Sequence, residues 1–414
     1  MTDTKALCLD VTRLVRRAEL THPTGIDRVE QAYLRMVLGW TGGPVFGLVR
    51  IGRRFAILDA AALRELSTHL GTGRPAIGPW RLAKRLAGLR RLSPLEATAR
   101  RIALATPSAS GLSGALGEWL PAGTVYLNVG HSNLETNVLT GIASVDNGRS
   151  VVLVHDTIPL DLPQYQRPGT VEAFRNKMQA VSLHADRVVV PSRAVAADVA
   201  RHFAVFGRLP PVVVAPLGLG LDPDAVRQEC PPEVADRPYF VCLGTIEPRK
   251  NHALLLDLWT DLHRTLPEDE VPRLVIVGRR GWRNEEVFRR LDTLPFMGRT
   301  VLERGDLADG PLVALLAGAR GLLHPSLAEG FGLPPQEAAA LGVTPVCAPL
   351  PVYRETLGDA AVYADPGDLY QWRNAVLRLA KIDGAGQGTP GTGRDRYDPP
   401  TWESHFKLAL TTIC

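Results

Sequence analysis

Short apolar runs rich in β-branched residues alternate with longer amphipathic stretches along most of the 414 residues. In the first half these runs are Ala6–Val11, Val45–Ile51, Thr124–Val129, Ser150–Val154 and Arg187–Val190. A second series comprises Tyr239–Leu243, Arg273–Val277, Thr300–Leu302, Gly321–His324 and Thr344–Cys347. Continuous apolar strands separated by helices are typical of parallel sheets that helices cover on both faces. The pattern therefore predicts an α/β protein with two doubly wound, Rossmann-like domains.

Proline and glycine mark where one domain is expected to end and the next to begin. The stretch Val213–Pro223, followed by Pro231 and Pro232, is rich in both and suits a linker. Residues 384–400 hold five glycines and three prolines, which favours a flexible loop. The predicted units are a first domain at 1–225, a second domain at 226–383, the loop at 384–400 and a C-terminal helix at 401–414.

Composition narrows the class of protein. The chain is 45% hydrophobic, and its formal charge of +4, from 47 basic and 43 acidic residues, is too small to indicate nucleic acid as a partner. No apolar run approaches the roughly 18 residues of a membrane-spanning helix, and no signal-peptide core is present. The five cysteines show no Cys-x-x-Cys spacing, as expected of reduced thiols. A cytoplasmic protein is predicted.

Two carboxylates, Glu329 and Glu337, have seven residues between them, across a glycine-rich turn that leads into a helix. Pro334 and Pro335 suit the first helical turn, so Glu337 is expected on the helix and Glu329 in the loop before it. Glycines in such a turn let the backbone approach a ligand, and a helix N-terminus offers free N–H groups. The segment can hold an anion and a polyol together; the alternative is a surface turn with two solvated glutamates.

Arg249 and Lys250 follow the predicted strand Tyr239–Leu243 and precede a helical pattern. Loops at the carboxyl ends of strands are where open α/β sheets bind ligands. A guanidinium fork and an ammonium group together can neutralise a diphosphate. The alternative is an ordinary basic helical turn, in which the cations would oppose the helix dipole.

Two segments of the first half carry weaker signals. His155 and Asp156 end a buried-type strand, where an imidazole can donate to a sugar hydroxyl, although a lone histidine at a strand end is more often structural. Gly25 opens a helical pattern after the first strand and could admit a phosphate or an acceptor hydroxyl close to the backbone; plain turn chemistry explains it equally well.

The Glu-x7-Glu spacing with Gly-Phe-Gly-Leu-Pro inside it resembles the signature of the family 4 glycosyltransferases, retaining enzymes of the GT-B fold, and among them bacterial mannosyl- and rhamnosyl-type polysaccharide enzymes. The resemblance covers about residues 120–380. It implies that the two domains face each other across a cleft, with 1–225 as the acceptor-side domain and 226–383 as the nucleotide-sugar-binding domain, and that the C-terminal helix crosses back to the first domain. It implies that Glu329 orients the donor sugar and that Glu337 accepts the ribose hydroxyls. The backbone around Gly330, Phe331 and Gly332 would contact the sugar.

The same resemblance assigns the remaining candidates. Lys250 matches the family's donor-phosphate lysine. Many members carry the partner arginine directly after the glycine, where Thr245 stands here, so that Arg249 is the available substitute. His155 matches a histidine that lines the donor sugar pocket, and Gly25 matches a glycine-containing loop.

The predicted function is transfer of a hexose or deoxyhexose from a nucleoside-diphosphate sugar to a glycan or lipid-linked acceptor, in cell-surface polysaccharide synthesis. Neither a cofactor nor a metal ion is expected. A non-catalytic relative that binds nucleotide sugars or glycans, and a nucleotide-sugar epimerase of the same architecture, remain alternatives. A nicotinamide dehydrogenase is disfavoured because no Gly-x-Gly-x-x-Gly follows the first strand.

Basic residues dominate Pro79–Ala105, where seven arginines and lysines face one acidic residue, Glu96. A basic amphipathic helix suits an anionic lipid surface. The segment predicts reversible membrane attachment; the alternative is a solvated helix that caps the first domain with its leucines in the core.

Overall fold

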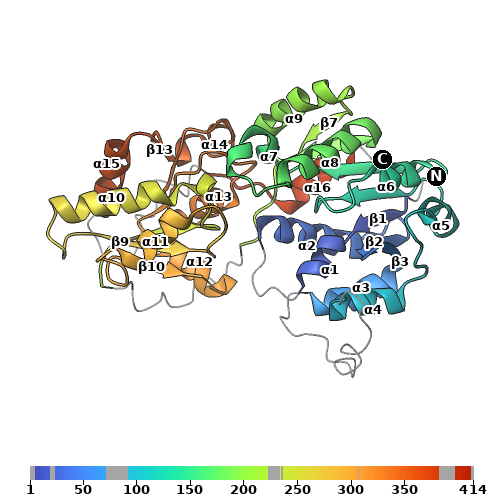
Figure 1. Ribbon diagram of the computed structural model, residues 1–414, viewed down its shortest axis with the longest axis horizontal. Coiled ribbons are helices and arrows are strands. Elements are labelled where there is room, and N and C mark those ends of the chain that lie inside the picture. Colours follow the sequence, from blue (N-terminus) through green and yellow to red (C-terminus); the bar gives the residue numbers. More distant parts are fainter. Residues whose placement is uncertain are drawn as a thin grey trace.

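Two α/β domains lie side by side in the computed structural model, which describes residues 5–18, 24–70, 92–221, 234, 236–305, 307–381 and 397–411 (Figure 1). Each domain is built on one sheet with helices on both of its faces. The predicted boundary near residue 225 lies outside the described residues, as do most of the predicted loop at 384–400 and residues 79–91 of the basic segment.

The first sheet has the strand order β3-β2-β1-β4-β5-β6-β7 among the described residues. Its strands are β1 (Leu7–Asp10), β2 (Val45–Ile51), β3 (Arg54–Leu58), β4 (Val125–Asn128), β5 (Arg149–Leu153), β6 (Arg187–Val190) and β7 (Val212–Val214). All neighbours run parallel except β2 and β3, which form an antiparallel hairpin. The five strands predicted for this half are confirmed.

Two strands of this sheet differ from the prediction. β3 follows β2 after a two-residue turn at Gly52 and Arg53, so its apolar residues merge with the preceding run in the sequence. The placing of Val213 and Val214 in a linker was wrong, because they belong to β7 and pair with Val189 and Val190 of β6. Edge strands this short carry too few residues to show a period.

Helices cover both faces of the first sheet, and alternate residues of β1 show how. Leu7 and Leu9 enter one apolar cluster and Cys8 enters the other. The helices of this domain are α1 (Thr12–Arg17), α2 (Gly25–Leu38), α3 (Ala60–His69), α4 (Pro94–Ile102), α5 (Leu112–Trp119), α6 (Thr136–Ala143), α7 (Ile158–Asp161), α8 (Thr170–His184) and α9 (Arg193–Phe206), with a short 3-10 turn at η3 (Pro163–Tyr165). α4 buries Leu95 and Ala99 against the first cluster, so this described part of the basic segment caps the domain.

The second sheet is entirely parallel, with the order β10-β9-β8-β11-β12-β13. Its strands are β8 (Tyr239–Leu243), β9 (Arg273–Val277), β10 (Val301–Arg304), β11 (Gly321–His324), β12 (Pro345–Cys347) and β13 (Val362–Tyr363). Its helices are α10 (His252–Thr265), α11 (Glu285–Thr293), α12 (Asp309–Ala317), α13 (Leu333–Ala340), α14 (Pro351–Thr356) and α15 (Leu369–Ala380), with 3-10 turns at η6 (Pro248–Lys250) and η7 (Gly358–Ala360). All strands run in the same direction, but the strand order reverses at β8: β9 and β10 lie on one side of it and β11 to β13 on the other. Such sheets bind ligands in the crevice at this switch point, here between the loops after β8 and β11.

The final helix, α16 (Trp402–Thr411), returns to the first domain as predicted. Its His405 is buried: Nδ1 faces the carbonyls of Ala215 and Pro216 at 3.1 Å, and Nε2 lies 2.8 Å from the hydroxyl of Tyr33. Because a carbonyl only accepts, Nδ1 carries the hydrogen and Nε2 accepts from the tyrosine. Gly218 makes the approach possible, since a Cβ there would lie 2.3 Å from the amide nitrogen of Trp402.

Contacts between the domains join segments far apart in sequence. Phe331 and Leu333 of the second domain pack against the first domain's apolar cluster. The carboxylate of Glu355, on α14, accepts from the amides of Arg193 and Ala194 at the start of α9, at 2.8 and 3.1 Å. Each of these contacts lies close to the predicted site.

Candidate active site

Arg249, Lys250 and Glu329 come together at the carboxyl ends of β8 and β11. The Glu329 Oε1 atom lies 2.8 Å from Nη1 of Arg249 and 2.5 Å from Nζ of Lys250. Arg249 also binds Glu247 at 2.7 Å and the carbonyl of Ala328 at 2.6 Å. Adjacent parallel strands end at one edge of the sheet, which is why residues 79 positions apart meet. We call Arg249, Lys250 and Glu329 the donor-side charge cluster.

The three charged side chains of this cluster are largely buried, which strengthens the attraction between them. The side chains of Arg249, Lys250 and Glu329 are 17%, 12% and 10% exposed. Burial by itself would raise the pKa of Glu329, but Arg249 and Lys250 outweigh it and hold that pKa well below its usual range. Burial also lowers the pKa of Lys250, against the attraction of Glu329. The cluster is thus an ionised network withdrawn from water, with two cations and Glu329 at its centre.

His324 and Glu247 join this network, and the sequence reading missed both. Nε2 of His324 lies 3.3 Å from Lys250 Nζ and 3.3 Å from Glu329 Oε1. Burial, reinforced by Lys250, lowers the pKa of His324 to about 4, so the ring is neutral. The sequence did contain a signal for His324: it is the last residue of a buried strand, and His155 follows the end of another such strand by two residues.

Close backbone packing supports the loop that carries the cations. Gly278 has φ 157°, and a Cβ on it would lie 2.0 Å from the carbonyl oxygen of Gly244. Only glycine therefore fits at position 278, where the loops after β8 and β9 touch. This contact holds the start of the cation-bearing loop against the neighbouring strand end.

Gly330, Phe331 and Gly332 bridge to the first domain. A Cβ on Gly330 would lie 2.1 Å from the carbonyl oxygen of His155, and the Gly330 carbonyl accepts from Ser192 at 3.3 Å. Phe331 is buried, and Gly332 caps α13 in the left-handed conformation at φ 74°. Within the described part of the chain the amides of these three residues donate to no protein acceptor, which leaves them available to a ligand.

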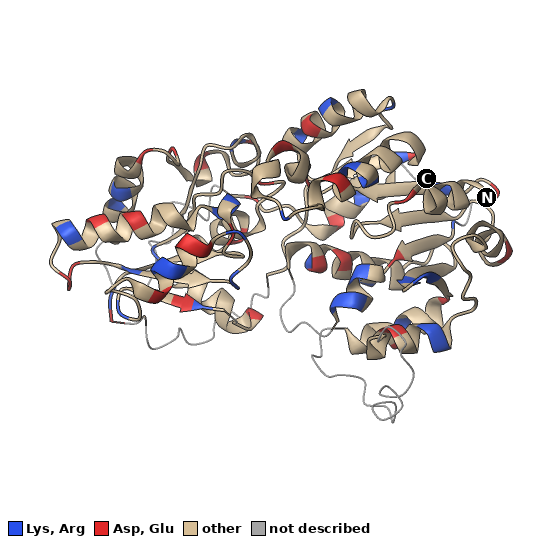
Figure 2. Cartoon of the chain, in the orientation of Figure 1, with Lys and Arg blue, Asp and Glu red and all other residues tan. Residues whose placement is uncertain are grey.

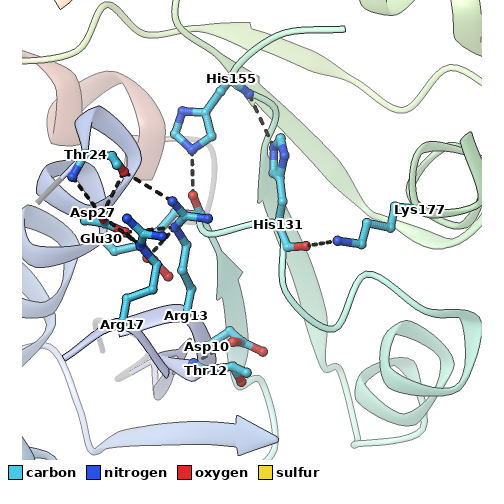
Figure 3. Close-up of polar contacts among 11 residues, drawn as sticks. Asp10, Thr12, Arg13, Arg17, Thr24, Asp27, Glu30, His131, His155 and Lys177 are labelled. Atoms are coloured by element: carbon cyan, nitrogen blue, oxygen red, sulfur yellow. Dashed lines mark hydrogen bonds and ion pairs between the residues drawn. The ribbon is translucent and has the colours of Figure 1, made fainter. Parts of the chain in front are cut away.

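His155 lies at the end of β5, with its ring turned into the first domain (Figure 3). Nε2 donates to the carbonyl of Val129 at 2.7 Å, so Nδ1 is the ring nitrogen left to accept a hydrogen. Burial lowers the pKa of His155 to about 4, so the ring is neutral. Burial raises the pKa of Asp156, beside it, to about 6, against the pull of Arg249. The His155 segment therefore lies between the two domains.

Glu337 meets an arginine of the first domain. Its Oε1 accepts from Arg28 Nη1 at 2.8 Å, and the other arm of the same guanidinium lies 3.2 Å from Asp309. Glu337 is 4% exposed, and burial raises its pKa against the effect of Arg28. Arg28 follows Gly25 by one helical turn, and a Cβ on Gly25 would make ordinary contact, at 3.4 Å, with Leu333 of α13. The start of α2 therefore faces the helix that carries Glu337, a pairing that the sequence did not predict.

Among the described residues, no group of three or more His, Cys, Asp or Glu side chains is arranged to hold a metal ion. None of the described helices is long and apolar enough to cross a bilayer.

Comparison with known proteins assigns the part of the chain that carries this site to a domain family. Residues 228–383, which contain the donor-side charge cluster and Glu337, match the family described as "Glycosyl transferases group 1". The chain carries a group 1 glycosyl transferase domain. Its two parallel-sheet domains have the GT-B architecture. The sequence resemblance to this class of glycosyltransferase is confirmed.

Several proteins similar to this chain are named as mannosyltransferases. The chain is 31% identical over 224 residues to the serotype-specific mannosyltransferase WbdA of Escherichia coli, a match over 51% of this chain and 27% of that protein. It is 27% identical over 266 residues to the O-antigen chain mannosyltransferase B of Escherichia coli, over 62% of this chain and 68% of the relative. The chain thus spans about a quarter of the length of WbdA.

Solved structures show the same fold over the whole chain. HepE of Anabaena, crystallised with UDP-glucose, superposes with a TM-score of 0.62 at 17% identity and covers 99% of each chain. The trehalose-6-phosphate synthase OtsA superposes with a TM-score of 0.58 at 12% identity, over 99% of this chain and 97% of that one.

Proposed function

We propose that this chain transfers a hexose or deoxyhexose, with retention of anomeric configuration, from a nucleoside-diphosphate sugar to a glycan or lipid-linked acceptor in cell-surface polysaccharide synthesis. The observation that carries the proposal is the buried donor-side charge cluster, positioned at the switch point of the second sheet within the group 1 glycosyl transferase domain. The likeness to mannosyltransferases supports a hexose or a related sugar as the group transferred.

In this proposal Arg249 and Lys250 bind the diphosphate of the donor. Negative charge grows on the leaving phosphate oxygen as the anomeric carbon becomes oxocarbenium-like. Preorganised cations aimed at developing charge contribute on the order of 3 kcal/mol each to the barrier reduction. The cations here are already desolvated, so little reorganisation is needed. Neither a metal ion nor a cofactor is required by this scheme.

The remaining residues would position the donor. Glu329 orients the sugar, with the free amides of Gly330, Phe331 and Gly332 reaching its hydroxyls, and Glu337 accepts the ribose hydroxyls. The neutral ring of His155 lines the sugar pocket. Retention would follow from attack on the face that the diphosphate leaves, with the departing phosphate oxygen taking the proton of the acceptor hydroxyl.

A thermal-shift panel of nucleoside diphosphates tests the donor site. We expect one base to raise the melting temperature more than the others, and Lys250→Ala and Glu337→Ala to weaken that effect. Arg289→Ala is the matched control, because Arg289 lies on α11 and pairs with Glu286 on the surface. Equal nucleotide affinity in the parent and both site variants would refute the assignment.

Treatment with a chelator tests the chemistry. Transfer activity should survive it, because the proposed charge stabilisation comes from side chains. An absolute requirement for a divalent cation would overturn this mechanism.

Attachment to an anionic membrane surface through Pro79–Ala105 is proposed as well, on the charge of that segment alone. Co-sedimentation with anionic and neutral liposomes at two salt concentrations tests it. Binding should require anionic lipid and weaken with salt; its absence, or indifference to lipid charge, would contradict the proposal.

A further inference from the structure

Cations gather at the carboxyl edge of the first sheet, apart from the donor-side charge cluster. Arg13, Arg16 and Arg17 come from α1, which follows β1, and Lys177 comes from α8. Lysines and arginines are blue in Figure 2, and Figure 3 shows Arg13 and Arg17 beside Asp27 and Lys177 beside the carbonyl of His131. We call these four residues the first-domain cation cluster. None of the functions proposed above uses it.

Among the described residues, few carboxylates contact this cluster. Nε of Arg13 and Nε of Arg17 lie 3.0 and 2.9 Å from the same oxygen of Asp27. Arg16, which is exposed, donates to the carbonyl of Arg50 at 3.4 Å. Among the described residues, Arg13 and Arg17 thus share the carboxylate of Asp27, and Arg16 binds only a carbonyl.

Lys177 is a half-buried cation without an ion pair among the described residues. Its ammonium group donates to the carbonyl of His131 at 2.8 Å. Burial lowers its pKa, Arg13 and Arg16 lower it further, and Glu135 partly offsets them. A cation withdrawn from water without a contacting carboxylate is unfavourable by itself and indicates that an anion from outside the chain completes the site.

Glu30 does not neutralise the cluster although it lies within it. Both of its carboxyl oxygens are buried without a hydrogen-bond partner, and Oε2 lies 3.5 Å from Nε of Arg13. Burial raises its pKa to about 9, against the effect of Arg13, so the group is a neutral acid at pH 7. Gly130 makes room for it, since a Cβ there would lie 2.0 Å from Oε1. A buried polar group left unpartnered beside cations is a second indication of a ligand.

The first-domain cation cluster lies next to His131 and His155, which stand between it and the donor-side charge cluster. The ring of His131, whose carbonyl binds Lys177, lies 5.1 Å from the ring of His155 between centroids. The His155 carbonyl in turn touches Gly330 of the second domain. An acceptor held at the first-domain cation cluster would therefore reach the donor sugar past His155.

We propose that Arg13, Arg17 and Lys177 bind an anionic group of the acceptor, a phosphate or a carboxylate, and that Glu30 hydrogen-bonds one of its hydroxyls. The inference rests on the proposed function and makes it more specific, because it assigns a charged acceptor rather than a neutral glycan. Two planar guanidinium forks and an ammonium group suit an oxyanion with several oxygens. Such a group occurs in a lipid-linked sugar phosphate and in an acidic sugar.

Calorimetric titration of the full chain, with its donor site first saturated by a nucleoside diphosphate, tests the inference. Glucose 1-phosphate, glucuronic acid and neutral methyl glucoside are the probes. We expect the anionic probes to bind and the neutral one not to. Tighter binding of the phosphate indicates a phosphorylated acceptor, and tighter binding of the carboxylate indicates an acidic sugar.

Two variants locate the binding. Lys177→Gln removes the charge but keeps a donor for the His131 carbonyl, and it should weaken the anionic probe roughly tenfold, the loss of one charge-assisted contact. Arg17→Gln should do the same, and it serves if the first variant fails to fold. Arg289→Gln, on the surface of α11, should change nothing.

The outcomes separate this inference from the proposed function. Unchanged nucleoside diphosphate affinity in Lys177→Gln, with loss of the anionic probe, supports a separate acceptor subsite. Equal binding of neutral and anionic probes, or undiminished binding in both variants, overturns it. If no nucleoside diphosphate binds the parent, the proposed function fails, and the same titrations without nucleotide still decide whether the cations hold an anion.

Discussion

Glu329 neutralises two buried cations at once, and its replacement should therefore affect stability as well as turnover. Among the described residues, Glu329→Ala leaves Arg249 paired with Glu247 alone and leaves Lys250 without a carboxylate in contact. Breaking a buried ion pair typically costs about 3–5 kcal/mol because a charge remains uncompensated. We expect a lower melting temperature for the variant, together with a lower turnover number.

A nucleoside diphosphate should restore more of the melting temperature in Glu329→Ala than it adds to the parent, because its phosphates replace the missing charge. Differential scanning calorimetry with and without ligand measures this. A variant that melts like the parent, or that the ligand fails to rescue, would contradict the charge assignment.

Glu30 should make the protein less stable as the pH rises. Its pKa is raised to about 9 in the fold, against 4.5 ordinarily, so between these values the folded chain holds a proton that the unfolded chain has lost. Stability then falls by about 1.4 kcal/mol per pH unit from this group. Glu30→Gln keeps the shape and removes the titration.

The advantage of Glu30→Gln over the parent should therefore grow from pH 5 to pH 8 in chemical denaturation. Asp59→Asn is a control at the N-cap of α3, where no such buried acid is removed. A stability difference that stays constant with pH would mean that Glu30 is ionised in the fold.

Some residues of the candidate site could be predicted from local sequence motifs, and others could not because their role depends on contacts between distant segments. Arg249, Lys250, Glu329 and Glu337 belong to local patterns whose spacing carries chemistry, and the structure brings the first three together. Arg28, by contrast, owes its importance to a contact with a helix 309 positions away. The first-domain cation cluster was missed for the same reason, since α1 and α8 lie far apart in the sequence.

At the scale of elements, the contact between the loops after β8 and β9 should tolerate no side chain. Gly278→Ala would place a Cβ 2.0 Å from the Gly244 carbonyl oxygen, at a φ that alanine avoids. We expect a loss of at least about 2 kcal/mol of unfolding free energy and weakened nucleotide binding.

Gly114→Ala is the matched control for Gly278→Ala. Gly114 lies inside α5 with nothing within 4 Å of the added Cβ, so the change should stabilise by about 0.5–1 kcal/mol. Urea denaturation of both variants measures the contrast. Equal effects would show that the loop contact is not tight.

The strands themselves illustrate why most elements were predictable. Buried parallel strands such as β5 and β9 are runs of valine, leucine and isoleucine that helices flank on both sides. β3 and β7 lie at the edges of the first sheet. Whether β3 and β7 form depends on pairing with the neighbouring strands β2 and β6 more than on their own amino acids. The sequence pattern alone therefore did not predict them.

For the whole molecule, Arg28 is a contact through which donor binding and domain closure can be coupled. The arginine belongs to the first domain and occupies Glu337, the proposed ribose ligand of the second. We predict that Arg28→Ala makes the ligand-free chain more open and that a saturating nucleoside diphosphate compacts it more than it compacts the parent.

Small-angle scattering of both proteins with and without the nucleotide measures this change. Arg354→Ala is a control, since Arg354 stacks on Tyr363 within the second domain. Identical radii of gyration for the parent and Arg28→Ala in both states would argue against the coupling.

The return of α16 to the first domain also has a consequence for the order in which the chain acquires its structure. Trp402, Phe406 and Ala409 contribute to the core that β1 and β2 began some four hundred residues earlier. A ribosome delivers the entire second domain before it delivers this helix. During synthesis the second domain can thus fold early, while apolar residues of the first domain around Tyr33 remain uncovered. Chaperone dependence and premature aggregation of nascent chains should concentrate in that interval, and expression at reduced temperature should relieve them.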